Sequence, residues 1–348
     1  MSAIYWSNGG RRAIGRRSCK DDVVQITALA GGIGGARFLR GLTQSKKVTR
    51  EVDVTVIANT GDDIWVHGVR VCPDLDTVMY TLGGGISVER GWGREGETFT
   101  AKEELAAYGV DPTWFGLGDK DLATHLIRTT SLNAGYTLSE VTSALCDRWQ
   151  PGINLIPMSD NRCETHVVID HPDTGARVAI HFQEWWIRYG AKLPAYEFIQ
   201  VGLDTAQPAP GVIDAISNAD LVLLPPSNPV VSIGTILTIP GITEAIRNTS
   251  APVLGLSPIV NNAPVRGMAD ACLSTINVQT NAAAVARHYG SRSDGGLLDY
   301  WLIDHTDVDS LGEIEHLGIT ARAIPLLMTD VDAAGAMANS ALDLVLEH

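Results

Sequence analysis

The stretch VVQITALAGGIGGARFLRGL, residues 23–42, decides the fold of this chain. Its first part, residues 23–30, is a short apolar run of the kind that forms a buried strand in a parallel sheet. The glycine-rich turn GGIGG follows at residues 31–35, and residues 36–42 are expected to form a helix. A buried strand that leads through glycines into a helix is the beginning of an α/β sheet.

The same order of strand, loop and helix occurs again further along the chain. Residues 52–58 (VDVTVIA) predict a second buried strand, which ends in the loop NTGDD at residues 59–63. A helix is expected to begin at Pro73 and to end near Leu82. Three helix-like stretches then follow one another within residues 101–150, which indicates a helical insertion.

The rest of the chain continues this alternation. Residues 170–176 (DHPDTGA) are rich in turn formers and predict a hairpin between strands at 165–169 and 177–182. Further buried strands are expected at 198–201, 221–224 and 253–256, and helices at 212–217, 243–247 and 330–346. We therefore predict a doubly wound, mainly parallel, Rossmann-like α/β sheet in one domain, residues 23–348, with the insertion at about 101–150.

Composition and charge exclude several classes of protein. The 348 residues include 26 Lys and Arg against 40 Asp and Glu, a net charge of −14, which argues against nucleic acid or anionic lipid as a partner. No apolar run reaches the roughly 18 residues of a membrane helix. The five cysteines are scattered without a CxxC pair, which indicates a reducing cytoplasm and neither a disulfide framework nor a zinc site.

Residues 1–22 differ from the rest because they are rich in arginine. They contain no apolar core of the kind that a signal peptide needs. We expect a disordered basic extension, or a start codon assigned too early, and the alternative is a basic arm that binds a partner.

The glycine turn is a candidate phosphate site. Gly31, Gly32, Gly34 and Gly35 would leave backbone N–H groups and a helix N-terminus open to an anion. The spacing is not GxGxxG, and no GK[ST] follows. A tight strand-to-helix turn without a ligand therefore remains the alternative.

Two acidic loops are a candidate metal site. Asp62 and Asp63 follow one predicted strand, and Asp74 and Asp76 precede or open a helix. Carboxylates are ligands suited to Mg²⁺, which neutralises charge in phosphoryl transfer. One of them could instead hydrogen-bond or deprotonate a substrate hydroxyl, and Asp74 or Asp76 could cap the helix.

The loop PPSNPVVSIG, residues 225–234, is a third candidate. Its prolines would hold Ser227 and Asn228 rigidly where an α/β sheet faces its ligand crevice. An ordinary loop with Ser232 as a helix cap remains the alternative. Candidate cations for an anionic ligand in this acidic chain are Arg94, Lys102, Arg188 and Arg266. Each of them, taken alone, is more often a solvated surface charge. The histidines show no triad or HExxH spacing, so no histidine nucleophile is expected.

These segments together resemble a known family. ALAGGIGGARFLRGL (28–42), NTGDDIWVHGVRVCPDLDTVMYTLGG (59–84), GWGREGETF (91–99), FQEWW (182–186) and LLPPSNPVVSIGTIL (223–237) are similar to the 2-phospho-L-lactate transferase family of coenzyme F-420 biosynthesis. The resemblance extends from about residue 25 to the C-terminus. RWQPG, HFQEWW and RGMAD resemble its actinobacterial branch, in which the transferred group is thought to be phosphoenolpyruvyl.

The resemblance implies an activity and a set of site residues. The family transfers a phosphorylated three-carbon acid from a guanosine diphosphate adduct to the terminal ribityl hydroxyl of the deazaflavin FO, and GMP leaves. It implies Mg²⁺ as the cofactor and a homodimer. By motif, the metal would lie at Asp62, Asp74 and Asp76, the catalytic groups would be Asp62 and Asp63, and substrate contacts would come from Thr60, Asp63, Arg94, Lys102, Ser227, Asn228 and the four glycines. Which loop holds guanosine, and whether the group is phosphoenolpyruvyl or phospholactyl, stay open.

Two other function classes are weighed against this one. A nucleotide-sugar-binding regulatory protein is the alternative, because the superfamily has a branch without transferase activity. Such a metal-independent binder would not need the acidic set. A dinucleotide-dependent dehydrogenase lacks the glycine spacing and the later acidic residue that its motif requires.

Overall fold

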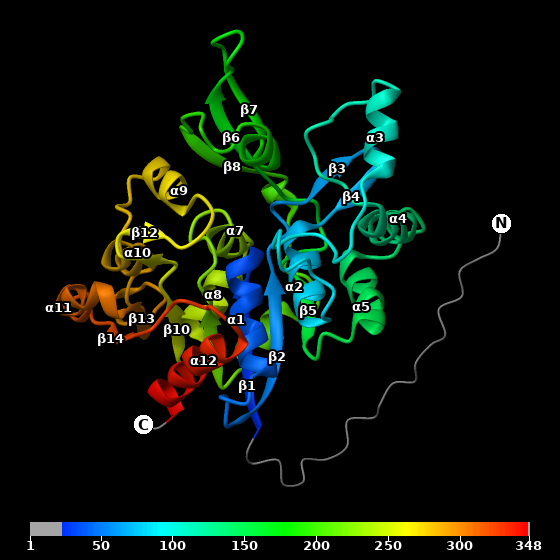
Figure 1. Ribbon diagram of the computed structural model, residues 1–348. Coiled ribbons are helices and arrows are strands. Elements are labelled where there is room, and N and C mark those ends of the chain that lie inside the picture. The colour runs from blue at the N-terminus through cyan, green and yellow to red at the C-terminus, as the bar shows by residue number, and fades with distance from the viewer. Residues whose placement is uncertain (1–22, 347–348) are drawn as a thin grey trace.

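The computed structural model describes residues 23–346, and the predicted basic extension at 1–22 lies outside them. A seven-stranded sheet in the order β14–β13–β10–β9–β1–β2–β5 forms its centre (Figure 1). Every strand pair in this sheet is parallel, which confirms the doubly wound, Rossmann-like prediction. The strands are β1 (Val23–Ala30), β2 (Glu51–Ala58), β5 (Asn154–Pro157), β9 (Leu221–Leu224), β10 (Val253–Leu256), β13 (Tyr300–Asp304) and β14 (Thr320–Ile324).

The strand order reverses beside β1. From β1 the chain moves outward through β2 to β5, and it then returns to β9, which pairs with the other edge of β1. In open α/β sheets, ligands bind beyond the carboxyl ends of the strands at such a switch point. The loops that follow β1, β2 and β9 therefore surround the expected crevice.

Helices cover both faces of the sheet, because its strands alternate buried side chains between two cores. In β1, Ile26, Ala28 and Ala30 belong to one core, whereas Leu29 belongs to the other. The first core is covered by α1 (Gly32–Gln44), α2 (Pro73–Leu82), α5 (Leu138–Trp149) and α12 (Val331–Leu346). The second is covered by α6 (Val212–Ser217), α7 (Ile233–Thr238), α8 (Ile242–Asn248), α9 (Ala269–Thr275), α10 (Ala282–Tyr289) and α11 (Leu311–Glu315).

The segment between α2 and β5 is helical. It contains α3 (Thr100–Ala107) and α4 (Asp119–Asn133) before α5, close to the three predicted stretches. An unpredicted hairpin of β3 (Ile64–Val66) and β4 (Val69–Val71) packs against this segment through Phe115 and Leu117.

A second sheet stands beyond the carboxyl edge of the first, at the top of Figure 1. It has the order β7–β6–β8, with β6 (Glu164–Asp170), β7 (Arg177–His181) and β8 (Glu197–Val201), and both pairs are antiparallel. The predicted hairpin is confirmed. The expectation of a buried strand at 198–201 is wrong, because β8 is an edge strand whose residues are exposed or only partly buried.

The remaining elements are short. They are the hairpin β11 (Ile259–Val260) and β12 (Ala263–Pro264), the π-helix Glu184–Arg188, and the 3₁₀-helices Leu203–Thr205, Arg292–Asp294 and His305–Ser310. Between residues 23 and 346, no helix is both long enough and apolar enough to span a bilayer.

Candidate functional site

The glycine turn lies where β1 passes into α1. The N–H of Gly31 donates to Ser227 Oγ at 3.2 Å, and Ser227 Oγ donates to the carbonyl of Gly31 at 2.8 Å. Gly32 has a positive φ of 62°, and its N–H donates to Asp74 Oδ1 at 2.7 Å. The first two N–H groups of the turn are therefore bonded to the protein itself.

The glycines also allow neighbouring loops to approach closely. A Cβ on Gly34 would lie 2.3 Å from the carbonyl oxygen of Pro226, and one on Gly35 would lie 2.6 Å from Ser227 Oγ. A Cβ on Gly31 would lie 2.5 Å from Asp74 Oδ2. Close contacts with backbone and side-chain atoms thus account for Gly31, Gly34 and Gly35, as the tight-turn alternative requires, and phosphate binding here stays a prediction.

Two buried carboxylates meet at one amide beside this turn. Asn59, directly after β2, donates from Nδ2 to Asp62 Oδ1 at 3.1 Å and to Asp74 Oδ2 at 2.9 Å. Burial raises the pKa of Asp62 well above its ordinary range, and the nearby Asp74 raises it further. Burial raises the pKa of Asp74 to about 6. No basic side chain in the described part of the chain forms an ion pair with either group, so this pair would be favoured by a cation.

The oxygens of this pair fit a magnesium ion. Mg²⁺ takes oxygen ligands and is commonly held by one or two carboxylates, with water and substrate phosphate completing its coordination. Asp62 and Asp74 supply that number of carboxylates at the switch point. Both accept from the Asn59 amide, Asp74 also accepts from the N–H of Gly32, and a bound cation would favour the charged form of both carboxyl groups.

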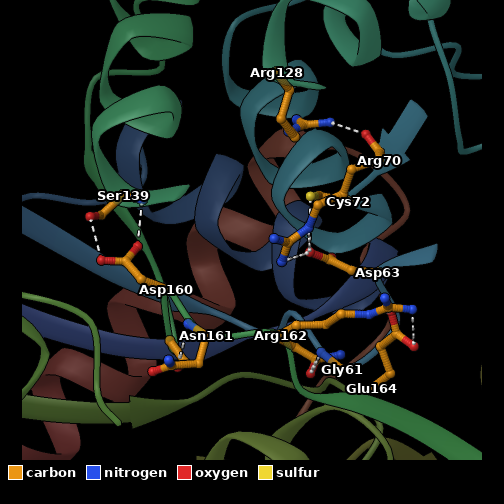
Figure 2. A network of polar contacts seen from close by, with 12 residues as sticks. Gly61, Asp63, Arg70, Cys72, Arg128, Ser139, Asp160, Asn161, Arg162 and Glu164 are labelled. Atoms are coloured by element: carbon orange, nitrogen blue, oxygen red, sulfur yellow. Dashed lines mark hydrogen bonds and ion pairs between the residues drawn. The ribbon is translucent and has the colours of Figure 1, made fainter. Parts of the chain in front are cut away.

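Asp63 is held by a different set of contacts (Figure 2). Its Oδ2 accepts from Arg70 Nη2 at 2.8 Å and Nε at 3.1 Å, and from Cys72 Sγ at 2.9 Å. Its Oδ1 is buried and has no hydrogen-bond partner among residues 23–346. Burial raises the pKa of Asp63 although Arg70 acts in the opposite direction. Asp63 therefore keeps one free acceptor beside the carboxylate pair.

His181 holds the backbone of the same loop. Its Nε2 lies 3.0 Å from the carbonyl oxygen of Asp63, and its Nδ1 accepts from the N–H of Gln183 at 3.0 Å. This pairing assigns the proton to Nε2 and leaves the ring neutral, in agreement with burial, which lowers the pKa of His181. The histidine positions the acidic loop and is not placed as a nucleophile.

Asp76 lies in a separate ion-paired cluster. Both of its oxygens accept from Arg128 of α4, and Oδ2 lies 3.7 Å from His125 Nδ1. Arg128 also donates to the carbonyl of Arg70 at 3.4 Å (Figure 2). Asp76, Asp121 and His125 lie close enough to share a cation, but Arg128 already neutralises Asp76. The structure thus brings Asp62 and Asp74 together and directs Asp76 elsewhere.

The side chains of Ser227 and Asn228 form hydrogen bonds with backbone groups of their own and the neighbouring loop. Ser227 closes the turn at Gly31, and Asn228 Oδ1 accepts from the N–H groups of Val230 and Val231 at 2.9 and 3.2 Å. The carbonyl of Val231 in turn lies 3.3 Å from Asn59 Nδ2. This loop therefore supports the carboxylate pair from the β9 side.

The other predicted substrate residues lie on separate segments. Thr60 Oγ1 is buried without a partner in the described chain. Arg94 donates to the carbonyl of Lys120 at 3.2 Å and stacks over Trp149, at 4.9 Å from the ring centre. Lys102 is half-buried on α3. Arg188 pairs with Glu184 at 2.7 Å on the surface.

The sequence reasoning missed Asn59, Arg70, Arg128 and His181. Asn59 could have been found, because it stands first in the loop NTGDD, directly after a predicted strand. Arg70 lies between the two acidic motifs, but it reaches Asp63 only through the β3–β4 hairpin, which was not predicted. Arg128 and His181 lie far from these motifs along the chain, and no local pattern marks them.

A known protein family matches most of this chain. The model of the family described as 2-phospho-L-lactate transferase CofD matches residues 26–317. The chain belongs to this family. The sequence signals that predicted it, NTGDD, PDLD and PSNP, lie together around the carboxylate pair.

Individual relatives are similar over almost their whole length. The chain is 61% identical to a phosphoenolpyruvate transferase of Streptomyces griseus subsp. griseus, over 93% of this chain and 99% of that protein. It is 57% identical to a phosphoenolpyruvate transferase of Mycolicibacterium smegmatis, over 92% and 98%. A crystal structure of the UPF0052 family protein BH3568 from Bacillus halodurans has a TM-score of 0.62 at 16% identity, covering 93% of this chain and 100% of that one. The last similarity concerns the fold alone.

Proposed function

We propose that this chain catalyses the Mg²⁺-dependent transfer of a phosphoenolpyruvyl group from a guanosine diphosphate adduct to the terminal ribityl hydroxyl of the deazaflavin FO, with release of GMP. The observation that carries the proposal is the buried pair Asp62 and Asp74 at the switch point of a chain of the CofD family. Relatives named phosphoenolpyruvate transferase, at 57–61% identity, favour this group over phospholactyl.

In this proposal, two carboxylates bind the metal and a third binds the attacking hydroxyl. Asp62 and Asp74 would hold Mg²⁺, which supplies charge neutralisation at the diphosphate. The unpartnered Oδ1 of Asp63 would accept a hydrogen bond from the attacking hydroxyl. The hydroxyl oxygen forms a bond to the phosphorus of the transferred group, the bond from that phosphorus to the GMP oxygen breaks, and the hydroxyl proton leaves to an acceptor. No covalent enzyme intermediate is needed.

The test is product formation with defined donors. Purified protein is incubated with FO and either the phosphoenolpyruvyl or the phospholactyl adduct of guanosine diphosphate, with Mg²⁺ or with EDTA, and the products are identified by mass spectrometry. We expect the phosphoenolpyruvyl product only with Mg²⁺, and a loss of at least a hundredfold in rate for Asp62→Asn. A preference for the phospholactyl donor would correct the group, and transfer in EDTA would contradict the metal assignment.

FO binding separates this function from a nucleotide-sugar-binding regulator. Titration of FO, followed by its fluorescence, should show saturable binding by the transferase. A chain that binds nucleotide sugar but not FO would be the regulator. A cytoplasmic homodimer is part of the same proposal. The mass of the particle in solution tests the dimer, and fractionation of cells tests the location.

A further inference from the structure

Two arginines near the site lack acidic partners although the chain is strongly acidic. Ion pairs with carboxylates are formed by Arg70, Arg128, Arg162, Arg177, Arg188, Arg287 and Arg292. Arg37 of α1 and Arg266, between β12 and α9, form none within residues 23–346. The same is true of other arginines in this range, so Arg37 and Arg266 are distinguished by their position beside the binding crevice, where an arginine without a carboxylate partner is available for an external anion. These other arginines are Arg40, Arg50, Arg90, Arg94, Arg148, Arg247 and Arg322.

Three separate segments bring these arginines to one place. A Cβ on Gly91 would lie 3.0 Å from Arg266 Nη1 and 3.0 Å from Cδ1 of Ile33, so the loop at Gly91 touches both. Ile33 is in the first turn of α1, directly after the glycine turn. Arg266 therefore reaches the start of α1 at the carboxyl edge of β1.

Arg37 lies on the same face of α1 as Ile33, one turn later. Side chains of a helix tilt toward its N-terminus, so the position of Arg37 favours a guanidinium on the side of Ile33 and the glycine turn. The contact of Arg266 with the first turn of α1 brings its guanidinium to the side of the helix that carries Arg37. In agreement with this, burial lowers the pKa of Arg37 and the charge of Arg266 lowers it further. Like charges held together without a counter-ion are unfavourable, and an anion between them removes that cost.

The residues directly after Arg266 pack against the second sheet, whereas Arg266 itself is exposed. Gly267 has a positive φ of 79°, and a Cβ there would lie 3.2 Å from the ring of Trp186. Met268 is buried in the core of the second sheet with Phe182 and Trp185. The RGMAD and FQEWW motifs, to which the proposed chemistry assigns no role, thus pack against each other directly beside Arg266.

We propose that Arg37 and Arg266 form an anion subsite that binds the phosphate groups of the guanosine nucleotide. The subsite rests on the proposed function, which supplies a donor with a diphosphate. It lies next to the carboxylate pair, because Gly32, one residue before Ile33, bonds directly to Asp74. Guanidinium groups match phosphate oxygens through paired hydrogen bonds.

The test is equilibrium binding of GDP and GMP by calorimetry, with Mg²⁺ and the full chain. We expect Arg37→Gln and Arg266→Gln each to weaken GDP binding roughly tenfold or more, and GMP binding less, since GMP offers one phosphate. Arg266→Lys should retain more affinity than Arg266→Gln because it keeps the charge. Arg247→Gln, which changes an exposed and unpaired arginine on α8, is the matched control and should bind GDP as the wild type does.

Wild-type affinity for GDP in Arg37→Gln or in Arg266→Gln would overturn the two-arginine subsite. An equal loss in Arg247→Gln would also overturn it, because the effect would then come from net charge. The measurement needs neither FO nor turnover. If GDP binding depends on the arginines but FO is not modified, the proposed function fails and the subsite stands. If FO is modified but the arginine variants bind GDP normally, the subsite fails and the function stands.

Discussion

At the scale of single residues, the carboxylate pair would link the proposed metal binding to stability. Burial raises the pKa of Asp74 to about 6, from an ordinary value of 3.8. The folded chain therefore holds this proton more tightly than the unfolded chain. The contribution of Asp74 to stability is greatest below pH 4 and is lost as the pH rises through 6, by up to about 3 kcal/mol.

A cation should remove this cost. In a chelator, the melting temperature of the wild type should fall from pH 4 to pH 7 more steeply than that of Asp74→Asn. At pH 7, Mg²⁺ should raise the melting temperature of the wild type but not that of the variant. Thermal unfolding followed by circular dichroism measures both, and an equal Mg²⁺ effect in the two proteins would contradict the metal site.

Arg70 should be more important for stability than an exposed arginine. It is the ion-pair partner of the buried Asp63, and its removal leaves that charge without compensation. We expect Arg70→Met to lower the free energy of unfolding by about 3–5 kcal/mol. Urea denaturation measures this, and the double variant Asp63→Asn with Arg70→Met should recover part of the loss. No recovery would show that Arg70 acts by packing and not by pairing.

At the scale of elements, the contact between α1 and the loop after β9 depends on glycine. A Cβ on Gly34 would lie 2.3 Å from the backbone oxygen of Pro226, which cannot rotate away. Gly34→Ala should therefore separate the two loops, lower the free energy of unfolding by more than about 2 kcal/mol and abolish transfer. Gly312→Ala on α11 meets no atom within 4 Å and should stabilise the chain by up to about 1 kcal/mol. Equal stability of the two variants in urea would contradict this account.

Some of the helices and strands could be predicted from the sequence, and others could not. The strand β1 and the bounds of α2 follow from local patterns, and the structure has them as Val23–Ala30 and Pro73–Leu82. The helix after β1 was predicted for residues 36–42 but spans Gly32–Gln44, because most of the glycine stretch forms the first turn of α1. The edge position of β8 was missed, because strand neighbours are set by contacts distant in sequence. The three-residue strands of the β3–β4 hairpin are too short to show a period.

The sequence predicted only part of the candidate site, and the geometry of α2 explains why Asp76 lies apart from Asp62 and Asp74. Asp62 and Asp74 follow or open elements at one edge of the sheet, so their meeting could be expected. Asp76 is two residues further along α2, and a helix turns about 100° per residue, so Asp76 faces away from Asp74. It faces Arg128 of α4, whose contact with α2 no local pattern reveals.

At the scale of the whole molecule, the net charge of −14 is compatible with the proposed anionic diphosphate substrate. Several of the carboxylates are compensated in place, as Asp63 is by Arg70 and Asp76 by Arg128. Asp62 and Asp74 form no ion pair within residues 23–346 and are the proposed site of a cation. Within the net charge of −14, the switch point thus combines the proposed metal-binding pair with two arginines that form no ion pair among residues 23–346.

Ligand-dependent stability of the whole chain can separate the function classes. The loops after β1, β2 and β9 are bonded to one another, so a ligand seated on them should stabilise the whole sheet and not one loop. At a concentration of 100 times its Kd, a ligand adds about 2.7 kcal/mol, which corresponds to a rise of several degrees in melting temperature for a chain of this size. We expect this rise with GDP and Mg²⁺ together, a smaller one with GDP in EDTA, and none with NADH. A rise with NADH alone would favour a dehydrogenase, and a rise with a nucleotide sugar in EDTA would favour the regulator.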